Sequence, residues 1–197
     1  QKCYISAGSK ANLFYVVAKT DEDVERGRGA MTMFLIDDPK AKGFEQRRMD
    51  TLGMKSSSVA ELFMDEVRVP KECILGQPGM ALSQNLAHTF AYDRAMIALR
   101  GLAVTELALD LTIAYTKGRK VFGKTVFDYQ NTKFKLAEMK ANLMVGQAFR
   151  DSLLKKLVAG ELDALTASVA KLWICENELQ TVPDCLQLHG GYGYINE

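Results

Sequence analysis

Three short patterns in this 197-residue sequence combine residue types and spacings that could do chemistry. Residues 119–124 read Arg-Lys-Val-Phe-Gly-Lys, a basic turn that could pair with a phosphate, helped by backbone donors where the next helix begins. Residues 189–193 read His-Gly-Gly-Tyr-Gly, a flexible backbone that a ligand could approach closely. Asp93 followed by Arg94 sets a carboxylate beside a cation, an arrangement suited to proton transfer.

Each pattern also has a simpler structural interpretation. The basic segment could be a turn between two helices with solvated charges, and the glycine segment could be a helix C-cap. The glycine segment follows no predicted strand, so it is not a dinucleotide-binding fingerprint. Asp93 could be an ordinary acid in the first turn of a helix, forming a surface salt bridge. Taken singly, none of the three patterns decides between chemistry and structure.

The composition excludes several classes of protein. A net charge of +1 argues against nucleic acid or an anionic membrane surface as the main partner. No apolar run approaches the roughly 20 residues needed to cross a bilayer, so no membrane insertion is expected. Four cysteines without a CxxC pair, and two histidines, provide no metal-ligand spacing. We therefore expect reduced thiols that pack as small hydrophobic side chains, and no metal site.

The first part of the chain has the pattern of an antiparallel sheet. Apolar runs of strand length occupy residues 13–18, 31–36, 59–64 and, ended by a proline, 67–70. The charged, glycine-containing residues 20–29 are typical of a hairpin loop between the first two runs. A loop with two glycines follows at 76–79.

From about residue 80 the apolar period becomes helical. A first helix carries two apolar stripes, which indicates burial on more than one side. The first stripe comprises Met96, Leu99, Ala103, Leu107, Leu111 and Ala114, and the second comprises Ala98, Leu102, Leu109 and Ile113. A second helix is predicted from about 132 to 158, ended by Gly160. A third should begin near Asp163 as N-cap, and Pro183 should kink or interrupt it before 185–188.

These elements predict an α+β fold. Residues 1–75 form part of an antiparallel β-domain, and residues 76–197 form an up-down helical bundle, because long helices with short connections pack antiparallel. A fourth helix would complete the bundle, and we expect it beyond Glu197. Both ends of the sequence are expected to be cuts through a longer protein.

Four patterns in one order carry a resemblance to a known family. The four patterns are, in chain order, residues 4–8 (Tyr-Ile-Ser-Ala-Gly), 62–70 (Leu-Phe-Met-Asp-Glu-Val-Arg-Val-Pro), 119–124 and 187–193 (Gln-Leu-His-Gly-Gly-Tyr-Gly). Gln130 and the Leu-Ala-Glu-Met of 136–139 follow the third pattern. Together they resemble the acyl-CoA dehydrogenase family along essentially the whole chain. The set is specific, although each piece alone is weak.

The resemblance implies FAD as cofactor, bound between the β-domain and the bundle and across a subunit contact. Tyr4 stands where an aromatic ring packs over the flavin. Ser6 stands where a hydroxyl donates near the flavin nitrogen that receives hydride. Two further groups match positions that grip the pyrophosphate and adenosine end of a flavin held mainly by the neighbouring subunit: Arg119, Phe122 and Gln130, and Gln187, Gly190 and Gly191.

The reaction implied by the resemblance is α,β-dehydrogenation of an acyl-CoA thioester to the trans-2-enoyl-CoA. A glutamate removes the α-proton, and an electron-transferring flavoprotein reoxidises the FAD. In most members this glutamate lies shortly past the glycine-rich turn, so here it is expected beyond Glu197. Glu197 itself is not expected to be that base.

Some members of the family place the base elsewhere. Isovaleryl- and long-chain-type members carry it on the first bundle helix, directly before an arginine that Arg94 matches. Asp93 is then the candidate base within the chain, one methylene shorter than glutamate. Arg94 would have a structural or substrate-loop role.

The resemblance further implies a homodimer or homotetramer, located in the cytoplasm of a bacterium or in the mitochondrial matrix of a eukaryote. Two alternatives stay open. An acyl-CoA oxidase would pass the electrons to oxygen instead of to a flavoprotein. A helical module used only for assembly would have no activity.

Overall fold

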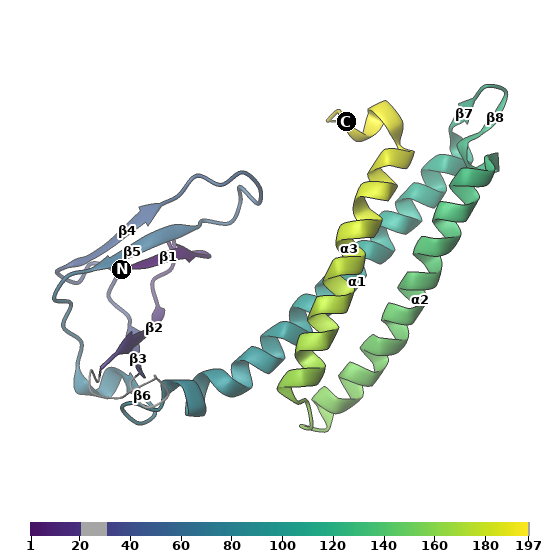
Figure 1. Ribbon diagram of the computed structural model, residues 1–197. Coiled ribbons are helices and arrows are strands. Elements are labelled where there is room, and N and C mark those ends of the chain that lie inside the picture. The colour runs from purple at the N-terminus through teal and green to yellow at the C-terminus, as the bar shows by residue number, and fades with distance from the viewer. Residues whose placement is uncertain (21–30, 197) are drawn as a thin grey trace. The chain divides into compact units, whose positions relative to one another are not determined.

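Strands come first along the chain and helices second, which confirms the predicted α+β fold. The computed structural model describes residues 1–20 and 31–196 and separates the chain into two units, residues 1–88 and 89–197 (Figure 1). None of the described helices is both long enough and apolar enough to cross a membrane.

The first unit contains two three-stranded antiparallel sheets. One sheet has the order β1 (Lys2–Ile5), β5 (Ala60–Met64) and β4 (Phe44–Arg48), and the other has the order β2 (Phe14–Lys19), β3 (Met31–Ile36) and β6 (Ile74–Leu75). Both sheets contribute to one core of buried side chains, formed by Phe14, Val16, Ile36, Phe44 and Leu62. The two sheets therefore bury their apolar faces against each other.

The predicted runs at 13–18, 31–36 and 59–64 form β2, β3 and β5 within one residue of their expected bounds. The first two pair antiparallel from Phe14 opposite Ile36 to Lys19 opposite Met31. The hairpin loop predicted over 20–29 lies outside the described residues, apart from Thr20.

The strand predicted over 67–70 is wrong. These residues belong to no strand, and Pro70 instead precedes the 3₁₀ turn η1 (Lys71–Cys73). The physical reason is that Pro70 has no N–H for a ladder, while its fixed φ suits the start of a turn.

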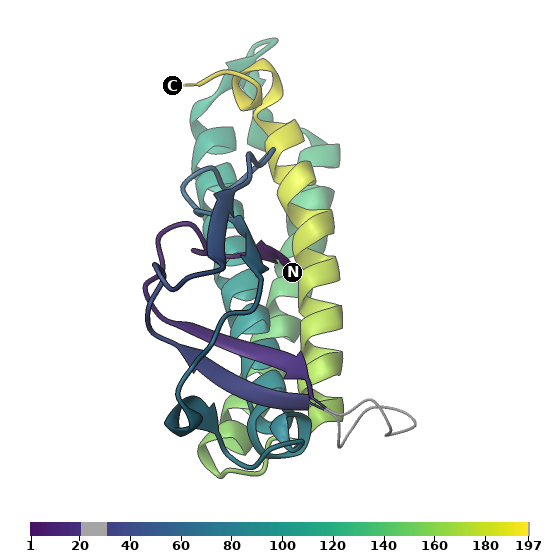
Figure 2. The same cartoon turned by 90° about the vertical axis from the view of Figure 1, so that its left-hand side faces the viewer.

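Three long helices fill the second unit and lie side by side (Figures 1 and 2). They are α1 (Ala87–Gly118), which follows the π-helical turn η2 (Ala81–Leu86), α2 (Gln130–Val158) and α3 (Ala164–Leu188). Between α1 and α2 lie the hairpin strands β7 (Lys120–Val121) and β8 (Lys124–Thr125) and the 3₁₀ turn η3 (Val126–Asp128). After α3 comes the 3₁₀ turn η4 (Gly190–Gly193).

The core of the bundle lies along the second predicted stripe of α1. Ala98, Leu102 and Leu109 are buried, and Leu102 packs so closely on α2 that a Cβ at Gly146 would stand 2.7 Å from its Cδ1. The first stripe is only partly covered, since Leu107 and Leu111 are 61% and 58% exposed.

The third helix begins as predicted and continues further than predicted. The Asp163 carboxylate accepts a hydrogen bond from the Thr166 N–H at 2.7 Å, which is N-cap geometry. The predicted interruption at Pro183 is wrong, because α3 runs through it to Leu188. Thr181 and Cys185 are buried on either side of the proline, and their packing holds the helix where one backbone hydrogen bond is lost.

Candidate functional site

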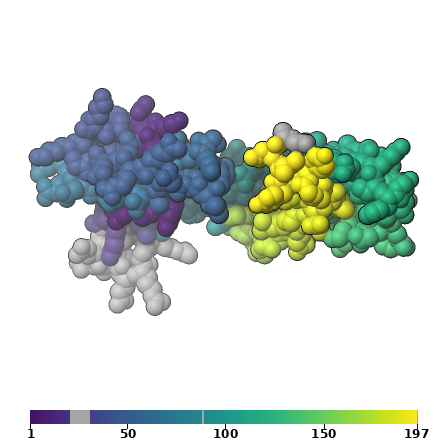
Figure 3. All heavy atoms as spheres, turned by 90° about the horizontal axis from the view of Figure 1, so that it is seen from above, coloured from purple at the N-terminus to yellow at the C-terminus, as the bar shows by residue number. Residues whose placement is uncertain are grey.

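A pocket of about 330 Å³ lies in the second unit, where the chain leaves α1 and where it leaves α3. Four of the predicted cofactor residues line it: Arg119, Gln187, Gly190 and Gly191. The space-filling view shows the C-terminal residues in yellow lying against the teal atoms of the α1 region (Figure 3). The structure thus brings together residues that are about seventy positions apart in the sequence.

The end of α1 fixes the backbone of Arg119. Its N–H donates to the Tyr115 carbonyl at 2.9 Å, and its own carbonyl accepts from the Val126 N–H at 2.8 Å. Arg119 is therefore tied to the helix before it and to the turn η3 after the hairpin. Its side chain is exposed and forms no ion pair with any described residue.

The charge around Arg119 is strongly positive. Lys117, Lys120 and Lys124 flank it along the chain, and Asp128 is the one acid between residues 117 and 133. The Asp128 carboxylate is engaged by Thr125, whose hydroxyl donates to it at 2.6 Å and whose backbone N–H donates at 3.1 Å. These two hydrogen bonds lower the pKa of Asp128 and keep it charged. Asp128 accepts these hydrogen bonds from Thr125 and forms no ion pair with Arg119, which leaves Arg119 available to an anionic ligand.

The glycine turn after α3 leaves open space at the pocket. A Cβ at Gly190 or Gly191 would meet no atom within 4 Å beyond those of its own chain neighbours. Gly190 has a positive φ of 63°, which explains its residue type, but Gly191 has no such conformation. Neither packing nor backbone conformation requires glycine at 191, so the missing side chain leaves room for a ligand to approach the backbone.

Gly193, in the same turn, has a different reason for being glycine. A Cβ there would lie 2.7 Å from the Leu186 carbonyl oxygen and 3.0 Å from the Leu186 Cδ1. The first clash involves backbone, so it cannot be relieved by a side-chain rotation.

This difference gives a testable pair of substitutions. Gly193→Ala should lower the free energy of unfolding by about 1–3 kcal/mol because the clash forces the turn to shift. Gly191→Ala should leave the denaturation midpoint nearly unchanged and should weaken binding of the ligand that fills the pocket. Chemical denaturation of both variants measures the first effect. Equal losses of stability in the two variants would contradict the assignment of Gly191 to a ligand.

Phe122 and Gln130 do not line this pocket. Phe122 is at the tip of the β7–β8 hairpin, 98% exposed, with a positive φ of 48°. The hairpin is held by Tyr129, whose hydroxyl donates to the Val121 carbonyl at 3.0 Å and whose ring centroid lies 4.0 Å from the Lys124 Nζ. Gln130 is the exposed first residue of α2. A large side chain with a positive φ is rare and strained, so the hairpin presents the Phe122 ring at a conformational cost.

Tyr4 and Ser6 belong to the first unit, whereas the group around Arg119 belongs to the second. Tyr4 is 76% exposed and also has a positive φ, 60°, within the irregular register of β1. Ser6 is exposed at a pocket of about 370 Å³ that residues of β1 and β2 line. The strained backbone of Tyr4 is the kind of feature that gathers at ligand sites.

Asp93 and Arg94 lie in the second turn of α1. Asp93 is exposed and forms no ion pair with any residue that the structure describes, so the salt bridge with Arg94 is absent. The Arg94 guanidinium instead lies 5.8 Å from the centroid of the Phe90 ring. The carboxylate of Asp93 is therefore available for another role.

The other candidate for the base involves the end of the sequence. The glutamate that most family members use was expected beyond Glu197, and Glu197 itself was set apart from it. Glu197 lies outside the described residues, which end at 196, so no structural role is assigned to it. Asp93 is thus the candidate base that lies within the described residues.

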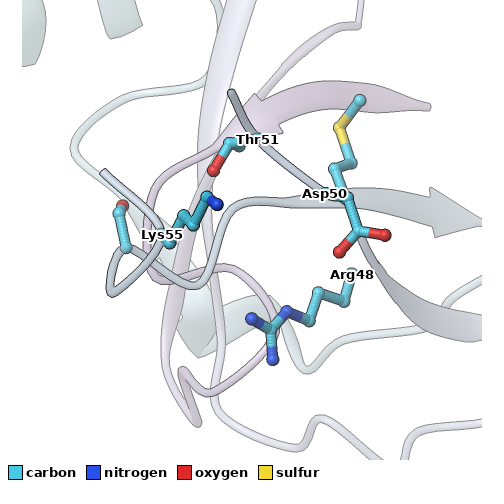
Figure 4. Close-up of a pocket in the computed structure, with 6 residues that line it drawn as sticks. Arg48, Asp50, Thr51 and Lys55 are labelled. Carbon is cyan, nitrogen blue, oxygen red and sulfur yellow. The ribbon is translucent and has the colours of Figure 1, made fainter. Parts of the chain in front are cut away.

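A further hollow of about 280 Å³ lies in the first unit, on the loop after β4. Figure 4 shows the Lys55 and Thr51 side chains pointing toward one another, while the Arg48 guanidinium turns away from the Asp50 carboxylate. None of the predicted site residues lines it. Within the described ranges, 1–20 and 31–196, no cluster of three or more His, Cys, Asp or Glu side chains could hold a metal ion.

Among the residues that line the pocket of Arg119, sequence reasoning did not single out Tyr115, and it quoted His189 and Tyr192 only as members of the glycine-rich run 189–193, with no role of their own. The only signal for them in the sequence is their spacing, since Tyr115 lies one helical turn before Arg119 and the other two flank the paired glycines.

Known proteins resemble this chain in sequence and in structure. A family model described as the C-terminal domain of acyl-CoA dehydrogenase matches residues 83–197. The long-chain specific acyl-CoA dehydrogenase of Mus musculus, a mitochondrial protein, is 34% identical over 196 residues, which cover 100% of this chain and 45% of that protein.

Two solved structures share the fold. The crystal structure of an acyl-CoA dehydrogenase from Geobacillus kaustophilus matches 98% of this chain and 51% of its own, with a TM-score of 0.93 at 30% identity. The crystal structure of the prolyl acyl carrier protein oxidase AnaB matches 98% of this chain and 50% of its own, with a TM-score of 0.89 at 27% identity. The chain thus spans about half the length of the relatives that it matches.

Proposed function

Because this chain belongs to the acyl-CoA dehydrogenase family, we propose that the whole protein oxidises an acyl-CoA thioester to the trans-2-enoyl-CoA with FAD as cofactor. The observation that carries the proposal is the pocket in which Arg119, an exposed cation without an acidic partner among the described residues, meets the open turn Gly190–Gly191. An arginine fork beside a backbone that no side chain covers is suited to a pyrophosphate.

In this proposal the second unit holds the pyrophosphate and adenosine end of FAD. Arg119 would donate to the phosphate oxygens, and the absence of a Cβ at Gly191 would let them reach the backbone. Gln187 and Gln130 would donate from their amides, and the protruding ring of Phe122 would contact the adenosine. The positive charge of the surrounding lysines supports an anionic ligand here.

The first unit would hold the ring system of the flavin. Tyr4 would pack over it, and the Ser6 hydroxyl would donate a hydrogen bond where negative charge develops. When bound, FAD supplies the acceptor for the hydride that leaves the β-carbon of the substrate.

We propose that the carboxylate of Asp93 is the base that removes the α-proton of the substrate. Loss of this proton leaves its electron pair on the α-carbon, where the double bond forms as the β-hydrogen departs as hydride. Asp93 precedes Arg94 on the first bundle helix, and the similar Mus musculus protein is a long-chain enzyme. Arg94 contacts Phe90 and not Asp93. It would therefore help to hold the conformation of the substrate loop, and it would not stabilise the charge of the Asp93 carboxylate. The competing assignment is a glutamate beyond Glu197.

A second candidate is an oxidase, in which oxygen takes the electrons. The fold that this chain shares with the oxidase AnaB supports this second candidate. The two candidates differ in how the reduced protein is reoxidised. A dehydrogenase should be reoxidised quickly by an electron-transferring flavoprotein and slowly by air, and an oxidase should show the reverse.

We propose a homodimer or homotetramer as the working form, in the mitochondrial matrix of a eukaryote or the cytoplasm of a bacterium. Exposed leucines recur every seven residues along α3, at 165, 172, 179 and 186, and such a stripe is suited to burial against another helix. Light scattering on the whole protein measures its mass, and a monomer at working concentration would contradict this.

The visible absorption spectrum of the purified whole protein tests the cofactor. We expect the two visible bands of an oxidised flavin, and release of FAD, not FMN, on denaturation. A colourless protein that takes up no FAD would overturn the proposed function.

A further inference from the structure

Four side chains join the end of α1 to the turn after α3, and we call them the aromatic clamp: Tyr115, Arg119, His189 and Tyr192. The rings of Tyr115 and His189 are stacked, with centroids 4.2 Å apart and planes at 19°. The Tyr115 hydroxyl also donates to the His189 carbonyl at 3.2 Å. The Arg119 guanidinium carbon lies 5.1 Å from the centroid of the Tyr192 ring, within cation–π range.

The two contacts of the clamp bracket the glycine turn. Tyr115 lies in the last turn of α1 and Arg119 comes directly after the helix, with its N–H donating to the Tyr115 carbonyl at 2.9 Å. His189 and Tyr192 flank Gly190 and Gly191 directly in the sequence. The glycine turn is thereby fixed at both of its ends against the segment that carries Arg119.

The His189 side of the clamp is anchored in the bundle core. The His189 Nε2 lies 3.4 Å from the Thr112 Oγ1, and Thr112 is buried. The Thr112 hydroxyl already donates to the Ala108 carbonyl at 2.8 Å, which leaves its oxygen able to accept from the imidazole. The position of the glycine turn is therefore tied to α1 through both Tyr115 and Thr112.

On the other side of the clamp, the Tyr192 ring orients the Arg119 side chain, which no other described group holds. The Arg119 guanidinium forms no hydrogen bond and no ion pair within the described residues, and the Tyr192 ring is the group packed against it. A ring against the guanidinium leaves N–H groups at its edge free to donate to phosphate. Holding a flexible side chain in place before the ligand arrives lowers the entropy lost on binding.

We propose that the aromatic clamp is a positioning device for the pyrophosphate site, in which Tyr192 acts through Arg119 and His189 acts through the glycine turn. This inference rests on the proposed function, because it takes a pyrophosphate-bearing ligand to be FAD. It adds to that proposal two residues that need not contact the cofactor and that nevertheless set its affinity.

The test compares two probes, ADP and adenosine, on the flavin-free whole protein by calorimetry. The probes differ by the pyrophosphate, so the ratio of their dissociation constants isolates the contribution of that group. Tyr192→Leu should reduce the preference for ADP by about three- to fivefold, the size expected of a cation–π contact near the surface. Tyr192→Phe, which keeps the ring, should retain the preference.

A matched control is available in the same segment. Tyr194 is 95% exposed, and Tyr194→Leu removes an equal aromatic surface without touching Arg119, so it should leave the ratio unchanged. In an Arg119→Met background, Tyr192→Leu should have no further effect, since the residue through which it acts is gone. The thermal denaturation midpoint of each variant, measured without ligand, reports folding separately.

The outcomes separate the clamp from the proposed function. Failure of the unaltered protein to bind FAD or ADP overturns the proposed function itself. Binding of FAD together with an unchanged ADP-to-adenosine ratio in Tyr192→Leu overturns the clamp alone. An equal loss of affinity for both probes assigns Tyr192 a structural role only, and that result also overturns the clamp.

Discussion

Asp93→Asn should slow reduction of the flavin by acyl-CoA by about a hundred- to ten-thousandfold, because a general base contributes a factor of that size. Asparagine keeps the shape of the side chain and cannot accept the α-proton. Stopped-flow absorbance under nitrogen measures the rate. The affinity of the protein for FAD should be unchanged, since Asp93 lies outside the pocket of Arg119, Gln187, Gly190 and Gly191.

Two further variants sharpen the assignment of the base. Asp93→Glu keeps the carboxylate and extends it by one methylene, so it should keep most of the rate or raise it. Asp110→Asn removes an exposed acid from the same helix and should have no effect. If Asp93→Asn leaves the rate intact, the base is not Asp93 and does not lie on α1. The base would then lie elsewhere in the whole protein, for example as a glutamate beyond Glu197.

Arg119→Met should weaken FAD binding by about ten- to a hundredfold, the loss expected when a charged group no longer donates to phosphate. The FAD affinity of Arg119→Lys should lie between those of the unaltered protein and Arg119→Met, because lysine keeps the charge and loses the planar fork. Quenching of FAD fluorescence on titration with flavin-free protein gives the dissociation constants.

The control for charge is Lys140→Met, which removes an exposed cation from α2 at a position that does not line the pocket of Arg119. It should bind FAD as the unaltered protein does. If Arg119→Met also binds FAD with unchanged affinity, the pocket at the end of α1 and α3 is not the pyrophosphate site.

The sequence predicted those strands whose apolar pattern is determined by burial alone. The runs that became β2, β3 and β5 are apolar because they line the interior of the two-sheet unit, where Phe14, Ile36 and Leu62 are buried. The strand β4 was missed, because its sequence Phe-Glu-Gln-Arg-Arg is mostly charged and exposed and so has no apolar run. The strand β1 was missed because its four residues, Lys-Cys-Tyr-Ile, form no apolar run, and its register with β5 is irregular.

The structure around two prolines differs from the prediction, for one reason. Pro70 was taken as the end of a strand and instead precedes a turn, and Pro183 was expected to kink or interrupt α3 and does not interrupt it. In both cases the proline fixes only its own φ and removes only one donor. Which structure continues around it depends on neighbouring burial, such as that of Thr181 and Cys185, which a single sequence does not reveal.

The candidate site was predicted in part. The basic turn and the paired glycines stood out by residue type, and their proximity in space was expected from the family resemblance and not from spacing. No role was predicted for Tyr115, because an aromatic residue at helical spacing is far more often core than site. His189 and Tyr192 were quoted only as neighbours of the paired glycines, whose backbone freedom was the signal in that run. Only the contacts across the pocket distinguish them.

Anaerobic bleaching of the flavin spectrum by acyl-CoA tests the proposed reaction most directly. The whole protein, purified with its cofactor and placed under nitrogen, is mixed with acyl-CoA thioesters of graded chain length, and the visible absorption is followed. The proposed function predicts that at least one thioester bleaches the flavin bands and yields the trans-2-enoyl-CoA, with the Asp93→Asn protein unbleached on the same timescale. A flavin-containing protein that no acyl-CoA bleaches, while dithionite still reduces it, would contradict the proposed function.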